Sequence, residues 1–181
     1  MTIMAEQDTI MTNDQQTGTT TPAPAVIDAA GVYYRDLNAR LREVVASGVR
    51  DIRIYNVCGQ RYIGTDLNAP VNITVNGTPG NDLGMFMKGP LITVHGNAQD
   101  GCGNTMDEGR IVIHGHAGDT VGLAARGGTI IIREGVGYRA GIHMKEYKEK
   151  MPVLVIGETA QDFCGEYMAG GVLILLSLIH I

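Results

Sequence analysis

Short runs of apolar residues recur along most of the chain and are separated by turns rich in glycine. Runs of valine, isoleucine and leucine that are bounded by such turns are typical of β-strands. A helical period occurs near the start, where Tyr33, Leu37, Leu41 and Val44 recur at three- and four-residue intervals. We therefore predict a mainly β protein with one helix at residues 32–47. The clearest predicted strands lie at residues 71–75, 91–94, 111–113, 129–132, 153–156 and 172–176.

A six-residue unit that ends in glycine precedes each of these strands. The units start at residues 59, 79, 98, 117, 136 and 160, in steps of 20, 19, 19, 19 and 24. A repeat of about 19 residues is too short for a propeller blade, and the units lack the pattern of a leucine-rich repeat. The fold class that fits is all-β, a single-stranded parallel β-helix of about six coils preceded by a short capping α-helix. An apolar residue also follows eight positions after each start, in the order Leu67, Met87, Met106, Ala125, Met144 and Met168.

The same pattern divides the chain into four segments. Residues 1–26 are rich in Thr, Gln, Asp, Asn and Ala, so we expect a disordered arm there. Residues 27–48 form a strand and helix cap, and residues 49–176 form the β-helix domain. Residues 177–181 do not fit the ladder, and we interpret them as a truncated or mis-joined tail.

A single coil buries too little apolar surface to fold alone, so neighbouring coils must share a core and the ends need caps. The predicted helix is the natural cover for the first coil. At the other end, residues 172–181 stop in mid-strand without polar cover, so we expect a partner, a homo-oligomer contact or a longer native frame there. The 24-residue step is explained by a charged insertion at residues 145–150, which should bulge out as a loop.

Charge and hydropathy narrow the classes of partner. The 14 basic and 19 acidic residues give a net charge of -5, so an electrostatic nucleic-acid interface is not expected. No run approaches the roughly 18 apolar residues of a membrane span, and the first residues lack a secretion signal. We therefore predict a cytoplasmic protein with no membrane partner.

The three cysteines are odd in number and lie far apart, without a CxxC pair, so the sequence favours reduced thiols over disulfides or a zinc site. Cys102 and Cys164 occupy the fifth place of the glycine unit, where other coils carry apolar residues. We interpret both as inert core thiols. Cys58 precedes the first unit and has no histidine nearby in sequence, so a nucleophilic role is not favoured.

Histidines recur after successive strands. His95 and His114 are 19 residues apart and Arg133 follows at the same interval, so we expect these side chains to stack at one corner of the coil. Together with His116 and His143 they could suggest a metal site. The absence of an HExxH pairing with carboxylates favours stacked or solvated histidines instead.

Aspartates form a second file in the glycine units, which could suggest acid–base chemistry or calcium. Turn aspartates that accept hydrogen bonds from their own backbone explain the file more simply. Residues 101–103, Gly-Cys-Gly, lack the third glycine and the following helix of a dinucleotide fingerprint. We therefore assign no catalytic, cofactor-binding or metal-binding residue to this chain. The file consists of Asp82, Asp100, Asp119 and Asp162.

Several glycine-rich motifs between about residues 27 and 176 carry a family resemblance. They closely resemble the GXGXG domain, the carboxy-terminal domain of the glutamate synthase large subunit, which is often encoded as a free-standing subunit. The resemblance implies a right-handed β-helix that is not itself catalytic. The motifs are Asn56-Val-Cys-Gly-Gln-Arg-Tyr-Ile-Gly64, Gly80-Asn-Asp-Leu-Gly84, Gly96-Asn-Ala-Gln-Asp100, Ile113-His-Gly-His-Ala-Gly-Asp119, Gly141-Ile-His-Met-Lys-Glu-Tyr147 and Gly165-Glu-Tyr-Met-Ala-Gly-Gly171.

In that family the FMN, the iron–sulfur cluster and the glutamine-hydrolysing nucleophile belong to other domains or partner subunits. The resemblance thus implies a scaffold subunit of an oxidoreductase complex, beside a flavin-binding glutamate synthase subunit and a glutamine amidotransferase subunit. Similar β-helices occur in the C subunit of formylmethanofuran dehydrogenase and in the N-methylglutamate synthase assembly, which remain alternatives. An autonomous β-helix that binds a metal or a sugar along the Asp and His files is a further alternative.

Overall fold

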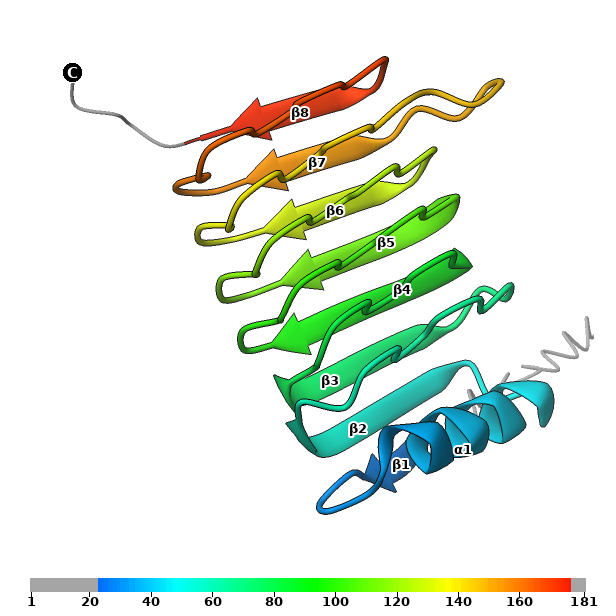
Figure 1. Cartoon of the computed structure of the whole chain (residues 1–181). Coiled ribbons are helices and arrows are strands. Elements are labelled where there is room, and N and C mark those ends of the chain that lie inside the picture. Colours follow the sequence, from blue (N-terminus) through cyan, green and yellow to red (C-terminus); the bar gives the residue numbers. More distant parts are fainter. Residues whose placement is uncertain (1–22, 177–181) are drawn as a thin grey trace, which may run out of the picture.

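The computed structural model describes residues 23–176 as a β-solenoid with one parallel sheet of eight strands (Figure 1). Each strand pairs with the next one along the chain, so sequence order and spatial order are the same. The predicted arm at residues 1–22 and the tail at residues 177–181 lie outside the described residues. The strands are β1 (Ala25–Asp28), β2 (Asp51–Cys58), β3 (Asn72–Thr78), β4 (Lys88–His95), β5 (Glu108–Ile113), β6 (Thr129–Ile132), β7 (Val153–Ile156) and β8 (Val172–Leu175).

All six predicted strands are present, and those at residues 129–132 and 153–156 match β6 and β7 in full. The solenoid makes about 7 turns, rather than about six, because β1 and β2 add to them. The strand expected in the cap at residues 27–48 corresponds to β1. β2 was missed because the prediction tied each strand of the β-helix to a preceding glycine unit, and β2 comes before the first unit. β1 begins at Ala25, so the solenoid starts within the segment assigned to the arm.

The core is a ladder of apolar side chains from the inward face of the sheet. Paired positions bring Ile73, Ile92 and Ile111 into register on β3, β4 and β5, and all three are buried. The opposite wall comes from the glycine units, where Leu83, Cys102 and Val121 form a second buried file. Because strands alternate their side chains between two faces, neighbouring residues such as Arg110 point away from this core.

The glycine units stack through backbone hydrogen bonds that repeat in every coil. The N–H at the fourth place donates to the third-place carbonyl of the next coil, as Asp82 does to Asp100. From the second unit on, the glycine that ends the unit donates back to the preceding coil, as Gly103 does to Leu83. Gly103 has a φ of +69°, and a Cβ there would collide with Ile130 of the core. Glycine is therefore required at this place by both conformation and space.

A cap built from β1 and α1 (Tyr34–Ala46) occupies the position of a coil at the amino-terminal end (Figure 1). β1 adds to the sheet edge, and Leu37 and Leu41 of α1 are fully buried in the core. The helix agrees with the prediction at residues 32–47 and with its capping role. The step from β1 to β2 is 27 residues, since Ala25 pairs with Ile52.

Side chains of α1 supply the hydrogen bonds that a preceding coil would otherwise provide. In later coils, two carbonyls accept N–H groups of the coil before: the one at the third place of the unit and the one of the residue directly after the unit. In the first unit these carbonyls belong to Arg61 and Thr65. Asn38 donates to Arg61 O at 2.9 Å and Arg42 donates to Thr65 O at 3.0 Å. Their spacing of four residues on the helix matches the four-residue spacing of the two carbonyls.

The 24-residue step contains an exposed loop, as predicted. Thr129 pairs with Val153, 24 residues later, whereas the pairs between β5 and β6 are 19 residues apart. Tyr147 and Lys150 form an isolated antiparallel bridge inside the loop. Lys150 also forms an ion pair with Glu108 at 2.7 Å. The loop therefore leaves the ladder before β7 and returns without changing its register.

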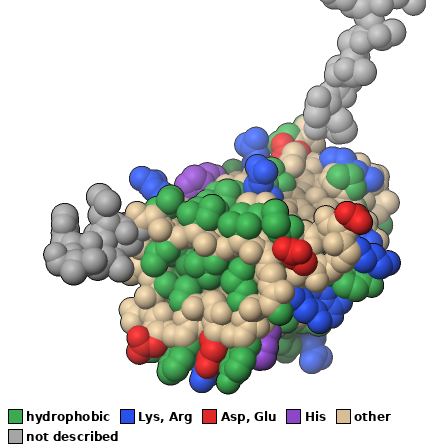
Figure 2. All heavy atoms as spheres, turned by 90° about the horizontal axis from the view of Figure 1, so that it is seen from above, with side chains coloured by type: hydrophobic (Ala, Val, Ile, Leu, Met, Phe, Trp, Pro, Cys, Tyr) green, Lys and Arg blue, Asp and Glu red, His purple; other side chains and the backbone are tan. Residues whose placement is uncertain are grey.

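At the β8 end, apolar side chains gather in the middle of the end face (Figure 2). Leu175 is 39% exposed, whereas its register partner Ile156 on β7 is fully buried. Cys164 and Met168 in the last described coil are only partly buried. This difference follows from position, since each inner coil is covered by the next one.

Candidate functional site

The aspartate file is built into the hydrogen bonding between coils. Asp100 Oδ1 accepts the N–H of Asp119 at 2.9 Å, and Asp119 Oδ1 accepts the N–H of Tyr138 at 2.9 Å. Each donor lies one coil further along the solenoid. The expectation that these carboxylates bond their own backbone is therefore wrong for Asp100 and Asp119, although their location in turns is correct.

Two glycines make room for these carboxylates. A Cβ on Gly118 would collide with Asp100 Oδ1, and a Cβ on Gly137 would collide with Asp119 Oδ1. The remaining aspartates differ, since Asp82 accepts a hydrogen bond from the Asn104 side chain at 3.2 Å. Asp162 lies exposed in the last described unit. The file therefore holds coils in register and does not converge on one point.

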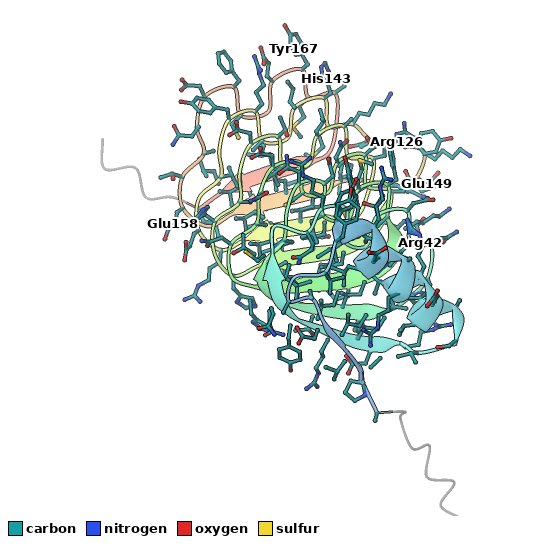
Figure 3. The ribbon with its side chains drawn as sticks, turned by 60° about the horizontal axis from the view of Figure 1, so that its bottom comes forward. Arg42, Arg126, His143, Glu149, Glu158 and Tyr167 are labelled. Carbon is teal, nitrogen blue, oxygen red and sulfur yellow. The ribbon has the colours of Figure 1, made fainter. Side chains whose placement is uncertain are left out.

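The histidines do not converge on one point. His95 and His114 stack with ring centroids 4.9 Å apart and an interplanar angle of 21°, which confirms the predicted stack for these two residues. Arg133 follows them one coil further, where its N–H donates to Ile113 O. His143 stacks on Tyr167 at 5.2 Å near the β8 end (Figure 3), and His116 lies exposed. Residues 23–176 contain no group of three or more His, Cys, Asp or Glu side chains placed to hold a metal ion.

The cysteines occupy three different environments. Cys102 is fully buried, as predicted, and its thiol donates a hydrogen bond to Gln99 O at 3.3 Å. Burial raises the pKa of this thiol to about 12, so it is not a nucleophile at neutral pH. Cys164 is half-buried and burial raises its pKa as well, while Cys58 is exposed.

Sequence reasoning missed the buried side chain of Gln60. Its Nε2 donates to Ala29 O at 2.8 Å and to Val32 O at 3.2 Å, and its Oε1 accepts the N–H of Cys58 at 2.6 Å. These bonds tie the loop between β1 and α1 to the first glycine unit. A glutamine at the second place also occurs as Gln99 and Gln161, both exposed, so residue type alone gave no signal.

A groove between α1 and the first glycine unit is the candidate binding surface of the described residues. Its volume is about 320 Å³. Tyr34 and Tyr62 form part of the lining with ring centroids 5.7 Å apart, and the Arg35 guanidinium lies 5.9 Å from the Tyr34 centroid. The hydrogen bond from Arg35 lowers the pKa of the Tyr34 hydroxyl. The groove, named here the cap groove, is lined by Tyr34, Arg35, Asn38, Ala39, Arg42 and Tyr62.

The cap groove combines an apolar lining with positive charge. Arg35 and Arg42 are its charged residues, and no carboxylate lines it. Figure 3 shows Arg42 projecting from α1 on the side of the solenoid turns. The helical pattern could have indicated this surface, since the lining residues of α1 lie beside the buried Leu37 and Leu41 stripe. Tyr62 could not be placed there from sequence, because it comes from the first glycine unit.

No helix within residues 23–176 is long and apolar enough to cross a bilayer.

Comparison with known proteins agrees with the sequence motifs. An uncharacterized protein of Methanocaldococcus jannaschii is 54% identical over 156 residues, which cover 84% of this chain and 60% of that protein. The chain thus spans less than two thirds of this relative, and no solved structure matches it. The GXGXG motif matches residues 45–180, in agreement with the resemblance to the glutamate-synthase-type GXGXG domain. The chain therefore belongs to the GXGXG motif family.

Proposed function

We propose that this chain is a non-catalytic scaffold subunit of a cytoplasmic glutamate-synthase-type complex. Such a complex transfers the amide nitrogen of glutamine to 2-oxoglutarate, with reducing equivalents passing through flavin. Its partners would be a flavin-binding glutamate synthase subunit with FMN and an iron–sulfur cluster, and a glutamine amidotransferase subunit. The solenoid would hold these two subunits in a fixed relation.

The family match over residues 45–180 is the observation that carries this proposal. The structural roles of the aspartate and histidine side chains also support the proposal. Asp100 and Asp119 are used in hydrogen bonds between coils, and His95 and His114 are stacked on each other. A long parallel sheet whose coils interlock in this way is suited to setting a distance between partners.

Affinity purification of the tagged chain from its native source tests the proposal. We expect a flavoprotein and an amidotransferase to co-purify in fixed stoichiometry, and the assembly to form glutamate from glutamine and 2-oxoglutarate. Asp100→Asn and His114→Gln variants should support the same kcat in this assembly, because neither residue contacts substrate in a scaffold.

Three results would contradict the scaffold role. A chain always recovered without flavoprotein and amidotransferase has no complex to support. A molybdopterin subunit in the purified assembly would instead assign the chain to a formylmethanofuran-dehydrogenase-type complex. Stoichiometric metal in the isolated chain, lost in the His114→Gln variant, would favour an autonomous binding protein.

A further inference from the structure

The cap groove is a positively charged surface on an acidic protein. Arg35 and Arg42 both line it, whereas the whole chain has a net charge of -5. Arg42 donates to a backbone carbonyl and Arg35 donates to the Tyr34 hydroxyl, and within residues 23–176 neither guanidinium forms an ion pair with a carboxylate. A segment that occupies this groove should therefore be acidic and should also carry apolar side chains for the tyrosine rings.

The amino-terminal residues of the same chain have this chemistry. Residues 1–22 contain the carboxylates of Glu6, Asp8 and Asp14 and no lysine or arginine. Their larger apolar side chains lie close to those carboxylates in sequence, with Ile10 and Met11 between Asp8 and Asp14. An adaptable methionine suits an irregular apolar surface such as one formed by two tilted aromatic rings.

The tether also places this segment near the groove. The described chain starts at Ala23, and β1 begins two residues later in the same cap as α1. The twelve residue-to-residue steps from Met11 to Ala23 can span up to about 40 Å, at about 3.3 Å per step. The α1 helix has 13 residues, so at 1.5 Å per residue it is about 20 Å long. Residues 8–14 can therefore reach every part of the cap groove.

We propose that residues 8–14 of this chain bind in the cap groove, with Ile10 and Met11 against Tyr34 and Tyr62. The carboxylates of Asp8 and Asp14 then face Arg35 and Arg42. A short tether gives an effective concentration on the order of millimolar, so even weak contacts suffice for binding within one molecule.

Paramagnetic relaxation of the full chain tests this placement. A nitroxide on Thr9→Cys, in a Cys58→Ser and Cys164→Ala background, should increase relaxation at the amides of Tyr34–Arg42 and Tyr62. We expect this increase to be several-fold larger than at the amides of residues 117–122 in a middle coil. Added salt should reduce it, since screening weakens contacts between exposed charges.

Three variants separate groove binding from general attraction to the helix. Ala39→Glu adds bulk and negative charge to the groove lining and should abolish the effect, whereas Arg40→Glu, on the same helix but outside the lining, should retain it. The double variant Ile10→Ser, Met11→Ser leaves the solenoid untouched and should also abolish it. Equal relaxation at groove and middle-coil amides would overturn the proposal. So would an increase in relaxation that persists in Ala39→Glu or in the double variant, or one that Arg40→Glu removes as fully as Ala39→Glu does.

Discussion

At the scale of single residues, the role of a side chain in this solenoid depends on which coil it belongs to. Gln60, Gln99 and Gln161 share the second place of the glycine unit, yet only Gln60 is buried. The loop between β1 and α1 presents backbone carbonyls to Gln60, and no such loop covers the others. A contact of this kind depends on the cap and cannot be deduced from the repeat.

Replacing Gln60 by leucine should destabilise the fold by about 2–4 kcal/mol, because Ala29 O, Val32 O and the N–H of Cys58 would lose their partner. Urea unfolding followed by circular dichroism measures this loss. Gln99→Leu is the matched control, and its stability should change by no more than about 0.5 kcal/mol. Equal effects of the two substitutions would show that the buried hydrogen bonds of Gln60 contribute nothing specific.

Cys102 should make stability depend on alkaline pH. Burial raises the pKa of its thiol from 9.0 to about 12, so the unfolded chain releases this proton first. The stability associated with the protonated thiol is complete below about pH 9 and falls by roughly 1 kcal/mol per pH unit from there toward pH 12. Cys102→Val, which carries the residue type of the same place in the next coil, should lack this component. Parallel stability curves for the two proteins between pH 8 and about 10.5 would contradict the expectation.

At the scale of elements, the repeat allowed the strands to be predicted but not the way in which the first coil is closed. β6 follows from the 19-residue period, and β7 follows from the glycine unit that precedes it after the 24-residue step. The period also placed the insertion before β7. Asn38 and Arg42 were not identified, because their partners Arg61 and Thr65 are distant in sequence. The same limit applies to the aspartates, whose donors lie one coil away.

The loop before β7 should be removable. Deleting residues 147–151 leaves Lys145-Glu146-Pro152-Val153, which corresponds to Lys88-Gly89-Pro90-Leu91 in a coil without an insertion. With Glu146→Gly added, we expect the solenoid to fold with its stability changed by no more than about 1 kcal/mol, since the lost Lys150–Glu108 ion pair is partly exposed. Thermal unfolding measures the change. Deleting the five residues 137–141 instead removes part of a glycine unit and should prevent cooperative folding.

At the scale of the whole molecule, stability should be distributed by nearest neighbours, because each strand pairs only with the strands before and after it in sequence. A defect in the cap should therefore loosen the nearby coils first. Leu41→Ala empties a fully buried site and should destabilise the fold by about 2–5 kcal/mol. Hydrogen exchange resolved by residue should show faster exchange in β2 and β3 and little change in β6 and β7. Uniform acceleration along the sheet would indicate one cooperative unit instead.

The Asp119 carboxylate packs against Gly137 one coil later, and this contact limits which sequence changes such a chain can accept as well as stabilising the fold. A residue that fills the space above Gly118 or Gly137 is compatible only with a smaller or differently oriented side chain one period earlier. Substitutions tolerated during evolution should consequently occur as correlated changes at positions about one coil apart, and not independently at each site. In an alignment of relatives of this chain, that covariation would show how many coils stack and in which order.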